Sequence, residues 1–260
     1  MPLKTCVLGS GSSGNCIYVA SEQTRILIDA GLSCKETARR LSVIGVELNS
    51  INAVCVTHEH DDHVSSLGPL HRKTGVKLYA NTGTIEVMER RKKCQGLPWN
   101  VFTTGAPFNI GDILITPFSV PHDSYDPVGF TVSHENSKLG IVTDMGAATE
   151  LIKERLKHCQ VMIVEANHDI DMLKNSHRPW SLKQRIASRQ GHLSNEKAGE
   201  LLTGVAGREL KAVFLAHLSS DCNRSEFAVH TVKEALKKIG RADIAIKLTY
   251  PDKQSEVEEI

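Results

Sequence analysis

Short apolar runs recur along the chain, and each is closed by polar residues and often followed by apolar residues at helical spacing. The runs are rich in Val and Ile, which is typical of strands. This pattern predicts strands at CIYVAS (16–21), RILIDAG (25–31), NAVCVTH, VKLYAN, ILITPFSV, VGFTVSH, KLGIVTD, VMIVEAN, AVFLAHL and DIAIKLTY. It predicts helices at 34–45, 84–93, 147–156, 195–205 and 225–239. Strands that alternate with helices indicate the α/β fold class.

Five of these predicted strands end at, or just before, a residue that can bind a metal or transfer a proton. The five residues are His58, His122, Asp144, Glu165 and His217. Sheets of the α/β class place their ligand sites at strand ends. We therefore expect the five side chains to share one rim of the fold.

The segment VTHEHDDHVSSL contains six consecutive residues that can bind metals or protons, beginning at His58. Successive side chains at an extended strand end point to opposite sides, so His58 and His60 share one face and Glu59 points away. A turn would then bring Asp62 and His63 together at the start of a helix. The string H-x-H-x-D-H arises by chance on the order of once per thousand chains of this composition, which makes a merely solvated helix start the weaker interpretation.

Length and charge limit the alternatives. At 260 residues, of which 40% are hydrophobic, the chain can bury a sizeable core, and we expect one domain over residues 1–260. Lys and Arg number 31 against 30 Asp and Glu, so the net charge of +1 gives no general attraction to nucleic acid or membrane. Any polyanion must therefore be bound by a local patch.

The seven cysteines are scattered, with no C-x-x-C pair. Their odd number and their spacing argue against a disulfide framework or a thiolate metal site. The N-terminus shows no basic segment followed by an apolar core, and no apolar run approaches the ~20 residues that span a bilayer. We expect a soluble protein of the reducing cytoplasm.

The order of these motifs resembles that of the metallo-β-lactamase-fold hydrolases, which are four-layer αββα sandwiches with a dinuclear metal site along one sheet edge. After THEHDDH come VPHDSYDPVGF, GIVTDMG and FLAHLS, so the resemblance extends over nearly the whole chain. It implies two divalent metal ions, which can be zinc, manganese or iron because mixed imidazole and carboxylate sites accept each of them. The ligands that it implies are His58, His60 and His122 on the first metal, Asp62, His63 and His217 on the second, and Asp144 as the bridge.

Several reactions occur on this fold, so the site residues must decide between them. Diiron reductases typically carry glutamate at the position of His60, and the histidine here favours hydrolysis. Sulfur dioxygenases use similar motifs around a single iron. A site with two metals bridged by Asp144 favours a metal-bound hydroxide as nucleophile, with its pKa lowered to ~7 by the cations.

Glu165 in VEANHD and His192 before SNEKA resemble a pair near the metals of ribonuclease Z and related phosphodiesterases. An alkoxide leaving from phosphorus must be protonated. We interpret His192 as the general acid and Glu165 as its orienting partner, although His192 could instead be a mere neighbour of a helix cap. Asp62 would orient the nucleophile, and His168 is a rival or a helper of His192.

A finer resemblance, to the YycJ/WalJ group of bacterial proteins, rests on GSGSSGNCIYV, PHDSYDPVGF, EANHDIDML and GHLSN followed by AHLS. It implies an exonuclease that acts on duplex DNA from the five-prime end. The segment SSDCN departs from the usual asparagine-rich ending, which leaves Asp221, Cys222 and Asn223 without a role. The alternative is a small-molecule hydrolase of a cyclic phosphodiester, a thioester or a lactone.

The segment MLKNSHRPWSLKQRIASRQ is basic and contains no Asp or Glu. The cations in it that we expect to contact the phosphates of nucleic acid are Lys174, Arg178, Lys183 and Arg185. Trp180 could stack on a base, or it could be buried beneath an ordinary solvated helix.

Two other segments carry simpler expectations. The glycine-serine loop at 9–14 predicts a tight β-turn, because it lacks the lysine of a phosphate-binding loop and precedes a strand. The acidic tail DKQSEVEEI is expected to fray.

Overall fold

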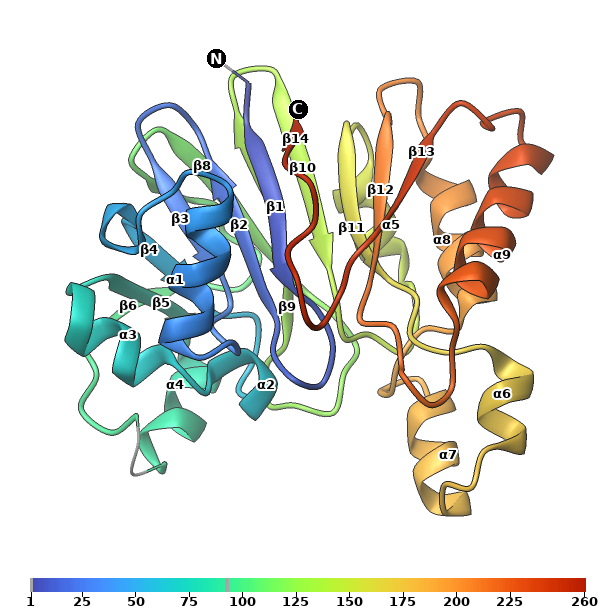
Figure 1. Ribbon diagram of the computed structural model, residues 1–260, viewed down its shortest axis with the longest axis horizontal. Helices are drawn as coiled ribbons and strands as arrows, with labels where there is room; N and C mark the ends of the chain where they lie inside the picture. Colours follow the sequence, from blue (N-terminus) through green and yellow to red (C-terminus); the bar gives the residue numbers. More distant parts are fainter. Residues whose placement is uncertain (1, 92–93) are drawn as a thin grey trace.

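The computed structural model describes residues 2–91 and 94–260, and within them two β-sheets stack face to face with helices on both outer faces (Figure 1). The first sheet has the order β14 (Glu258–Glu259), β1 (Lys4–Gly9), β2 (Cys16–Ala20), β3 (Arg25–Ile28), β4 (Ala53–Cys55), β5 (Lys77–Asn81) and β6 (Trp99–Phe102). The second has the order β13 (Ala245–Leu248), β12 (Ala212–Ala216), β11 (Val161–Glu165), β10 (Ser137–Val142), β9 (Val128–His134), β8 (Ile113–Ser119) and β7 (Phe108–Ile110). The α/β class and the four-layer αββα arrangement are confirmed.

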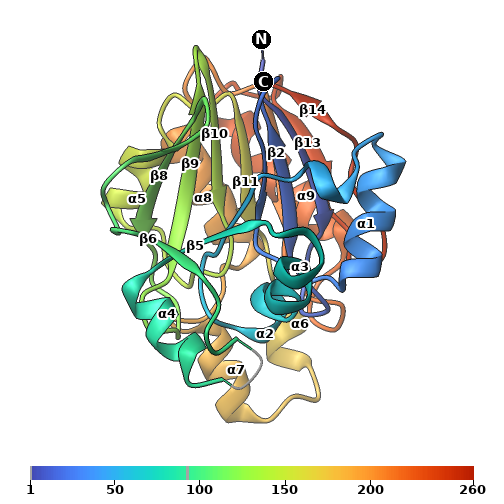
Figure 2. The ribbon, with the colours of Figure 1, turned by 90° about the vertical axis from the view of Figure 1, so that its left-hand side faces the viewer.

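Helices cover the outer face of each sheet. The first sheet is covered by α1 (Cys34–Val43), α2 (Asp61–Val64), α3 (Leu67–Thr74) and α4 (Thr82–Glu89), with the short 3₁₀ helix η1 (Leu48–Ser50). The second sheet is covered by α5 (Glu150–Leu156), α8 (Asn195–Val205) and α9 (Ser225–Lys238). Helices α6 (Ile170–Asn175) and α7 (Trp180–Ala187) lie beyond the end of the second sheet, at the bottom of Figures 1 and 2.

The core has three apolar layers because most strands bury both of their faces. In β11, Val161 and Ile163 pack between the two sheets, whereas Met162 and Val164 pack against the helices of the second sheet. A third layer joins the first sheet to its own helices. Strands that are covered on both sides have continuous apolar sequences, which explains why the apolar runs and the polar residues that close them located these strands.

Strand direction brings the predicted site residues to one edge. Strands β10 to β13 are parallel, and β8 runs in the same direction because both β8 and β10 pair antiparallel with β9. In the first sheet, β3 to β6 are also parallel. The ends of β4, β8, β10, β11 and β12 therefore meet at the edge of the sandwich where α2 lies, at the bottom of Figure 1.

Most predicted elements are present, with small shifts of their ends. Helix α8 has the predicted bounds, and α4 begins two residues earlier than predicted, while its predicted end at Lys93 lies outside the described residues. Strands β1, β6, β7 and β14 and helices α3, α6 and α7 were not predicted, whereas α2 is the helix whose start was expected at Asp62 and His63. Within the two described ranges, no helix combines the length and the apolarity needed to cross a bilayer.

The predictions for the glycine-serine loop and for the acidic tail have different outcomes. The loop between β1 and β2 contains a tight turn, in which the Gly14 amide donates to the Gly11 carbonyl at 2.9 Å. The prediction of a fraying tail is wrong, because β14 pairs with β1 and Ile260 packs into the layer between the sheets. One apolar residue at the end of an acidic segment is enough to fix it when its backbone can also join a sheet edge.

Phe130 tests the layer between the sheets, because its ring is fully buried there. We expect Phe130→Ala to lower the free energy of unfolding by about 3–5 kcal/mol, through lost burial and the cavity that remains. Urea denaturation followed by circular dichroism measures this change. Val101→Ala on the exposed side of β6 is the control and should change the value by less than about 0.5 kcal/mol. Equal effects of the two changes would contradict this account of the core.

Candidate metal centre

All seven residues predicted as metal ligands lie together at this edge. Their side chains form overlapping groups whose ligand atoms lie within 4.8 Å of one another: His58, His60 and His122; Asp62, His63 and His217; and His58, His63 and Asp144. A further group joins Asp144 and His217 to Glu165 and His192. The histidine and aspartate side chains thus converge from four strand ends, those of β4, β8, β10 and β12, on one small volume.

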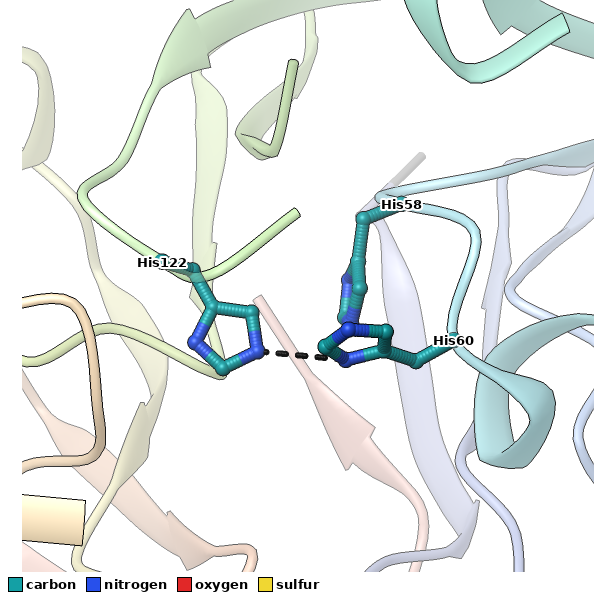
Figure 3. A group of neighbouring side chains, drawn as sticks. All are labelled: His58, His60 and His122. Atoms are coloured by element: carbon teal, nitrogen blue, oxygen red, sulfur yellow. Dashed lines mark hydrogen bonds between the residues drawn. The ribbon is translucent and has the colours of Figure 1, made fainter. Parts of the chain in front are cut away.

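His58, His60 and His122 face one another from two different loops (Figure 3). The Nε2 atom of His122 lies 3.3 Å from Nδ1 of His60. The Nδ1 atom of His122 donates to the Gly191 carbonyl at 3.1 Å, which fixes the ring and leaves Nε2 turned to the other two histidines. Three imidazoles that share a centre are a donor set that suits zinc.

Buried hydrogen bonds fix the tautomer of His58. Its Nδ1 lies 3.0 Å from Thr57 Oγ1, and that hydroxyl donates in turn to Asp29 Oδ2 at 2.8 Å. Because the hydroxyl proton is donated to Asp29, the hydroxyl oxygen must accept at the contact with His58, and His58 Nδ1 therefore carries a proton. The Nε2 atom is left with its lone pair, and it has no hydrogen-bond partner within the described residues.

Asp29 is a candidate positioning residue that the sequence interpretation missed. Its carboxylate is buried and accepts from His63 Nδ1–H at 2.7 Å and from the Thr57 amide at 2.8 Å. Burial raises the pKa of Asp29, and the contacts with His63 and Thr57 oppose that rise. A carboxylate behind a metal-binding imidazole orients the ring and raises its basicity. Asp29 follows β3 directly, so the strand-end criterion that found His58 would also have found it.

The backbone after β3 holds the start of α2 in place. The Ala30 amide donates to the His63 carbonyl and the Asn15 amide to the Asp62 carbonyl, both at 2.7 Å. A Cβ atom on Gly31 would lie 1.7 Å from the carbonyl oxygen of Asp62, so no side chain fits there. The Nδ2 group of Asn15 also donates to Asp62 Oδ2 at 3.0 Å. Asp62 and His63 are therefore positioned as a pair.

Asp144 lies close to predicted ligands of both sites, because it shares a group with His58 of the first and His63 of the second in which the ligand atoms lie within 4.8 Å of one another. Its Oδ2 lies 3.2 Å from His63 Nε2, and its Oδ1 lies 3.5 Å from His217 Nε2. Burial alone would raise the pKa of Asp144, but His217 and His63 hold it well below its usual value. The side chain is thus an anion surrounded by imidazoles.

His217 is held from three directions. The Ser10 hydroxyl, in the glycine-serine loop, accepts from the His217 amide at 2.7 Å. Asn167 donates to the His217 carbonyl at 2.8 Å, and Glu165 Oε1 lies 3.3 Å from His217 Nδ1. Burial would lower the pKa of His217, but the carboxylates of Asp144, Asp62 and Glu165 raise it to about 10.

Backbone strain accompanies this placement. Asp29, Asp144 and His217 have φ values of 64°, 53° and 56°, in the left-handed region that residues other than glycine seldom adopt. Each follows the end of a strand and turns its side chain back toward the cluster. A strained conformation of order 1–3 kcal/mol persists only where the surroundings fix it, and such residues concentrate at functional sites.

The buried polar atoms fit divalent metal ions. Within the described residues, His58 Nε2, His217 Nε2 and Asp144 Oδ2 are buried and make no hydrogen bond. Asp144 Oδ2 and His217 Nε2 still make ion-pair contacts, at 3.2 Å with His63 and at 3.5 Å with Asp144, but His58 Nε2 has neither kind of partner in the described part of the chain. A buried polar atom without a partner is destabilising by ~1–3 kcal/mol, so His58 Nε2 indicates a missing ligand. Imidazole nitrogens with a carboxylate oxygen are the donors that zinc, manganese and iron accept.

The other residues of the opening segment serve the scaffold. Glu59 is buried, and its Oε1 accepts from the Tyr125 amide at 2.9 Å, which ties this loop to the loop that carries His122. Asp61 is exposed and pairs with Arg91. Neither belongs to the groups of candidate metal ligands.

Glu165 and His192 form a close pair beside the cluster. The Nδ1 atom of His192 lies 2.6 Å from Glu165 Oε1, and Glu165 Oε2 accepts from the amides of Met145 and Leu193. Burial would raise the pKa of Glu165, but the charge of His192 and its hydrogen bond lower it to about 2. Burial lowers the pKa of His192, and the Glu165 carboxylate more than offsets this, so the net direction is upward.

The cations of the basic segment line two separate surfaces, one on each side of α7. Arg178 and Arg185 line the pocket beside His192 and His217, where Arg178 pairs with Asp221 and Arg185 with Asp123. Lys174 and Lys183 line a separate groove on the other side of the helix, together with Trp180 and His168. Trp180 is exposed, so the interpretation as a buried tryptophan is wrong.

The residues of the segment SSDCN make contacts that fix the loop after His217. Asp221 pairs with Arg178, and the Cys222 carbonyl accepts from the Asp169 amide. Asn223 donates to the Ala166 carbonyl and exchanges hydrogen bonds with Asn195. These contacts fasten the loop after His217 to the start of α8.

The chain belongs to the metallo-β-lactamase superfamily: the family model described as "Beta-lactamase superfamily domain" matches residues 24–217. That range contains all seven gathered ligands and the Glu165–His192 pair. Family and site together define a metal-dependent hydrolase.

Two curated relatives are more specific. The chain is 37% identical over 243 residues to exodeoxyribonuclease YycJ of Bacillus anthracis, covering 92% of this chain and 91% of the relative. It is 34% identical over 250 residues to exodeoxyribonuclease WalJ of Streptococcus pneumoniae, covering 95% and 92%. The resemblance to the YycJ/WalJ group is confirmed over nearly the full length of each chain.

Solved structures share the fold. The metallo-β-lactamase fold protein YhfI of Bacillus subtilis gives a TM-score of 0.77 at 16% identity and covers 100% of both chains. Zn²⁺-bound PqqB of Methylobacterium extorquens gives a TM-score of 0.73 at 15% identity and covers 99% of this chain and 100% of that one. At these identities the likeness is one of fold alone.

Asp29→Asn tests how the cluster is oriented. Asn keeps the volume of the side chain and tolerates the left-handed backbone, but it removes the charge behind His63. We expect metal affinity to fall about 10- to 100-fold with the far-ultraviolet circular dichroism unchanged. Competition against a chromophoric chelator measures the affinity, and Asp243→Asn, in an exposed pair with Arg241, is the control. Unchanged affinity would show that Asp29 has no orienting role.

Proposed function

We propose that this chain is a dinuclear metal-dependent phosphodiesterase, and specifically an exonuclease that acts on duplex DNA from the five-prime end. The observation that carries the proposal is the Glu165–His192 pair, held at 2.6 Å beside the seven gathered ligands. The names of the YycJ and WalJ relatives supply the DNA substrate. A thioester hydrolase has less need of an imidazole that protonates the leaving group, because a thiolate is a weaker base than an alkoxide and leaves more readily without a proton.

The ligand groups divide naturally into two sites. His58, His60 and His122 would hold one divalent metal, Asp62, His63 and His217 a second, and Asp144 both. We propose zinc or manganese, with iron as a further candidate. When bound, such cations supply a water molecule of lowered pKa and neutralise charge on a phosphate.

His192 would protonate the leaving oxygen. Its Nδ1 is engaged by Glu165, so Nε2 remains to deliver a proton, and the ring lines the pocket beside the cluster. A buried carboxylate stabilises the imidazolium form and fixes the direction of the ring. Two backbone amides hold Glu165 in turn, so the acid is preorganised before a substrate arrives.

The remaining roles concern the nucleophile and the DNA strand. Asp62 is partly exposed and faces both His63 and His217, where its carboxylate can orient a water molecule. Arg178 and Arg185 would bind the phosphates next to the cleaved bond, exchanging Asp221 and Asp123 for phosphate oxygens. His168 lines the groove across α7, so a role as helper in binding fits it better than a role as rival acid.

We also propose that residues 1–260 act as one domain and that the protein works in the cytoplasm. A single apolar layer joins strands from Leu3 to Ile260, which supports one domain. Cys6, Cys16, Cys55 and Cys159 are buried thiols, a state that suits a reducing compartment.

The first test compares substrates under metal control. Protein stripped by a chelator and reloaded with zinc or manganese is assayed on duplex DNA labelled at the five-prime end, on bis(4-nitrophenyl) phosphate and on a thioester. We expect the loaded protein to release label from DNA and the stripped protein to be inactive. Metal analysis of the native protein should show two ions per chain. Preference for the thioester, with intact DNA, would instead support the small-molecule hydrolase.

The second test isolates the proposed acid. We expect His192→Ala to lower kcat on DNA about 10²- to 10⁴-fold while both metals remain bound, because a general acid contributes in this range and His192 is not a required ligand. Inductively coupled plasma mass spectrometry reports the metals. His230→Ala, an exposed histidine on α9, is the control. Retained turnover in the metal-loaded variant would remove His192 from the mechanism.

A further inference from the structure

A groove separate from the metal centre lies between α6, α7 and the start of α8, and we call it the α6–α7 groove. Ile170, Leu173, Trp180 and Ala187 form its apolar walls. Trp180 is 67% exposed and Ile170 is 50% exposed. Apolar side chains open to solvent in a concave site indicate a surface that binds an apolar or aromatic group.

The charge of this groove points to an anionic ligand. Lys174, Lys183 and Lys197 line it, and among the residues described around it neither Asp nor Glu does so. The ammonium group of Lys183 donates to the Lys174 carbonyl, and that of Lys197 to the Gly146 carbonyl. Neither of these two ammonium groups is neutralised by a carboxylate there, so the rim attracts phosphate.

His168 adds a buried polar group to the apolar groove. The residue is only 3% exposed, and its Nδ1 makes no hydrogen bond within the described residues. Burial lowers the pKa of His168 to about 4, so the ring is neutral and offers one donor and one acceptor. An unpaired buried nitrogen in a lined groove is a hydrogen-bonding position for a ligand.

Helix α7 places this groove at a fixed distance from the metal centre. Leu182, Arg185 and Ile186 line the pocket beside His192, whereas Trp180, Lys183, Gln184 and Ala187 line the α6–α7 groove. These two sets occupy opposite faces at the spacing of a helix. A helix with its side chains is about 10–12 Å wide, which corresponds to about three base steps at ~3.4 Å each.

We propose that the α6–α7 groove binds one nucleobase of the substrate strand, about three nucleotides from the cleaved bond. The base stacks on Trp180, its edge bonds to His168, and the flanking phosphates contact Lys174, Lys183 and Lys197. A flat aromatic ring joined to phosphates matches apolar walls, a polar floor and a basic rim together. This assignment rests on the proposed nuclease function and adds a second contact beyond the arginines at the metal centre.

Steady-state kinetics of the metal-loaded enzyme test the groove. Loss of stacking in Trp180→Ala should raise KM for DNA roughly 5- to 100-fold with kcat nearly unchanged. Trp180→Phe should recover most of the affinity because it restores an aromatic face. Turnover of bis(4-nitrophenyl) phosphate, which has no base, should stay within about twofold. Phe227→Ala on α9, another exposed aromatic residue, is the matched control.

Abasic substrates locate the bound base. One abasic position about three nucleotides from the cleaved bond should raise KM for the native enzyme and should have no further effect in Trp180→Ala. His168→Ala should raise KM for the intact strand in the same direction. An equal KM of Trp180→Ala and the native enzyme, or a flat abasic series, would overturn the groove assignment while leaving the nuclease proposal intact.

A binding experiment decides the case in which the enzyme cleaves no DNA and the proposed function fails. In Trp99→Phe, Trp180 is the only tryptophan. Saturable quenching of its fluorescence by deoxyadenosine monophosphate, lost in His168→Ala, would support a nucleotide groove on an enzyme with another substrate. Lack of quenching would overturn the groove as well.

Discussion

Buried charge is the constraint on which this structure depends. Asp29, Asp144 and Glu165 lie within the fold among imidazoles, at an edge where few water molecules can reach them. Carboxylates in such a place are tolerated only when cations or hydrogen-bond donors compensate them. The surrounding architecture serves that compensation: the strands converge, backbone amides point at Glu165, and the loop after β1 reaches across to hold His217. The stability of the edge and its affinity for metal are thus two results of one arrangement.

Alternating strands and helices predicted the fold class, and the strand ends together with the opening segment predicted where candidate ligands gather, because both follow from local sequence. The full set of seven ligands was implied by the family resemblance. An apolar run identifies a strand, and the first polar residue after it must lie at the sheet edge. Short or polar elements escaped this reasoning. β6 and β7 lie at or near sheet edges and are partly exposed, and β14 has two residues, so none gives a long apolar run. Their place in the sheets comes from partners that are distant in the sequence.

Asp29 and the basic segment show a second limit. The strand-end criterion would locate Asp29, but its role depends on a contact with His63, 34 positions away, that spacing cannot reveal. The cations from Lys174 to Arg185 form one cluster in the sequence. In the structure they line two separate surfaces, because α7 lies between these surfaces. Which face of a short helix meets the site depends on where the helix begins, and no sequence signal had located α7. Composition therefore indicated that this segment can contact phosphates, and only the packing showed which surface each cation lines.

The position of α7 gives the width of a helix a functional meaning. If the bases pass α7 as proposed, the width of this helix sets the number of nucleotides between the metal centre and the α6–α7 groove. A strand of fewer than about four nucleotides could not occupy both at once and would lose the affinity that comes from joining two contacts. Digestion would then slow near that length and release short oligonucleotides as its final products. The length of the smallest fragment left at the end of the reaction would then reflect the width of α7.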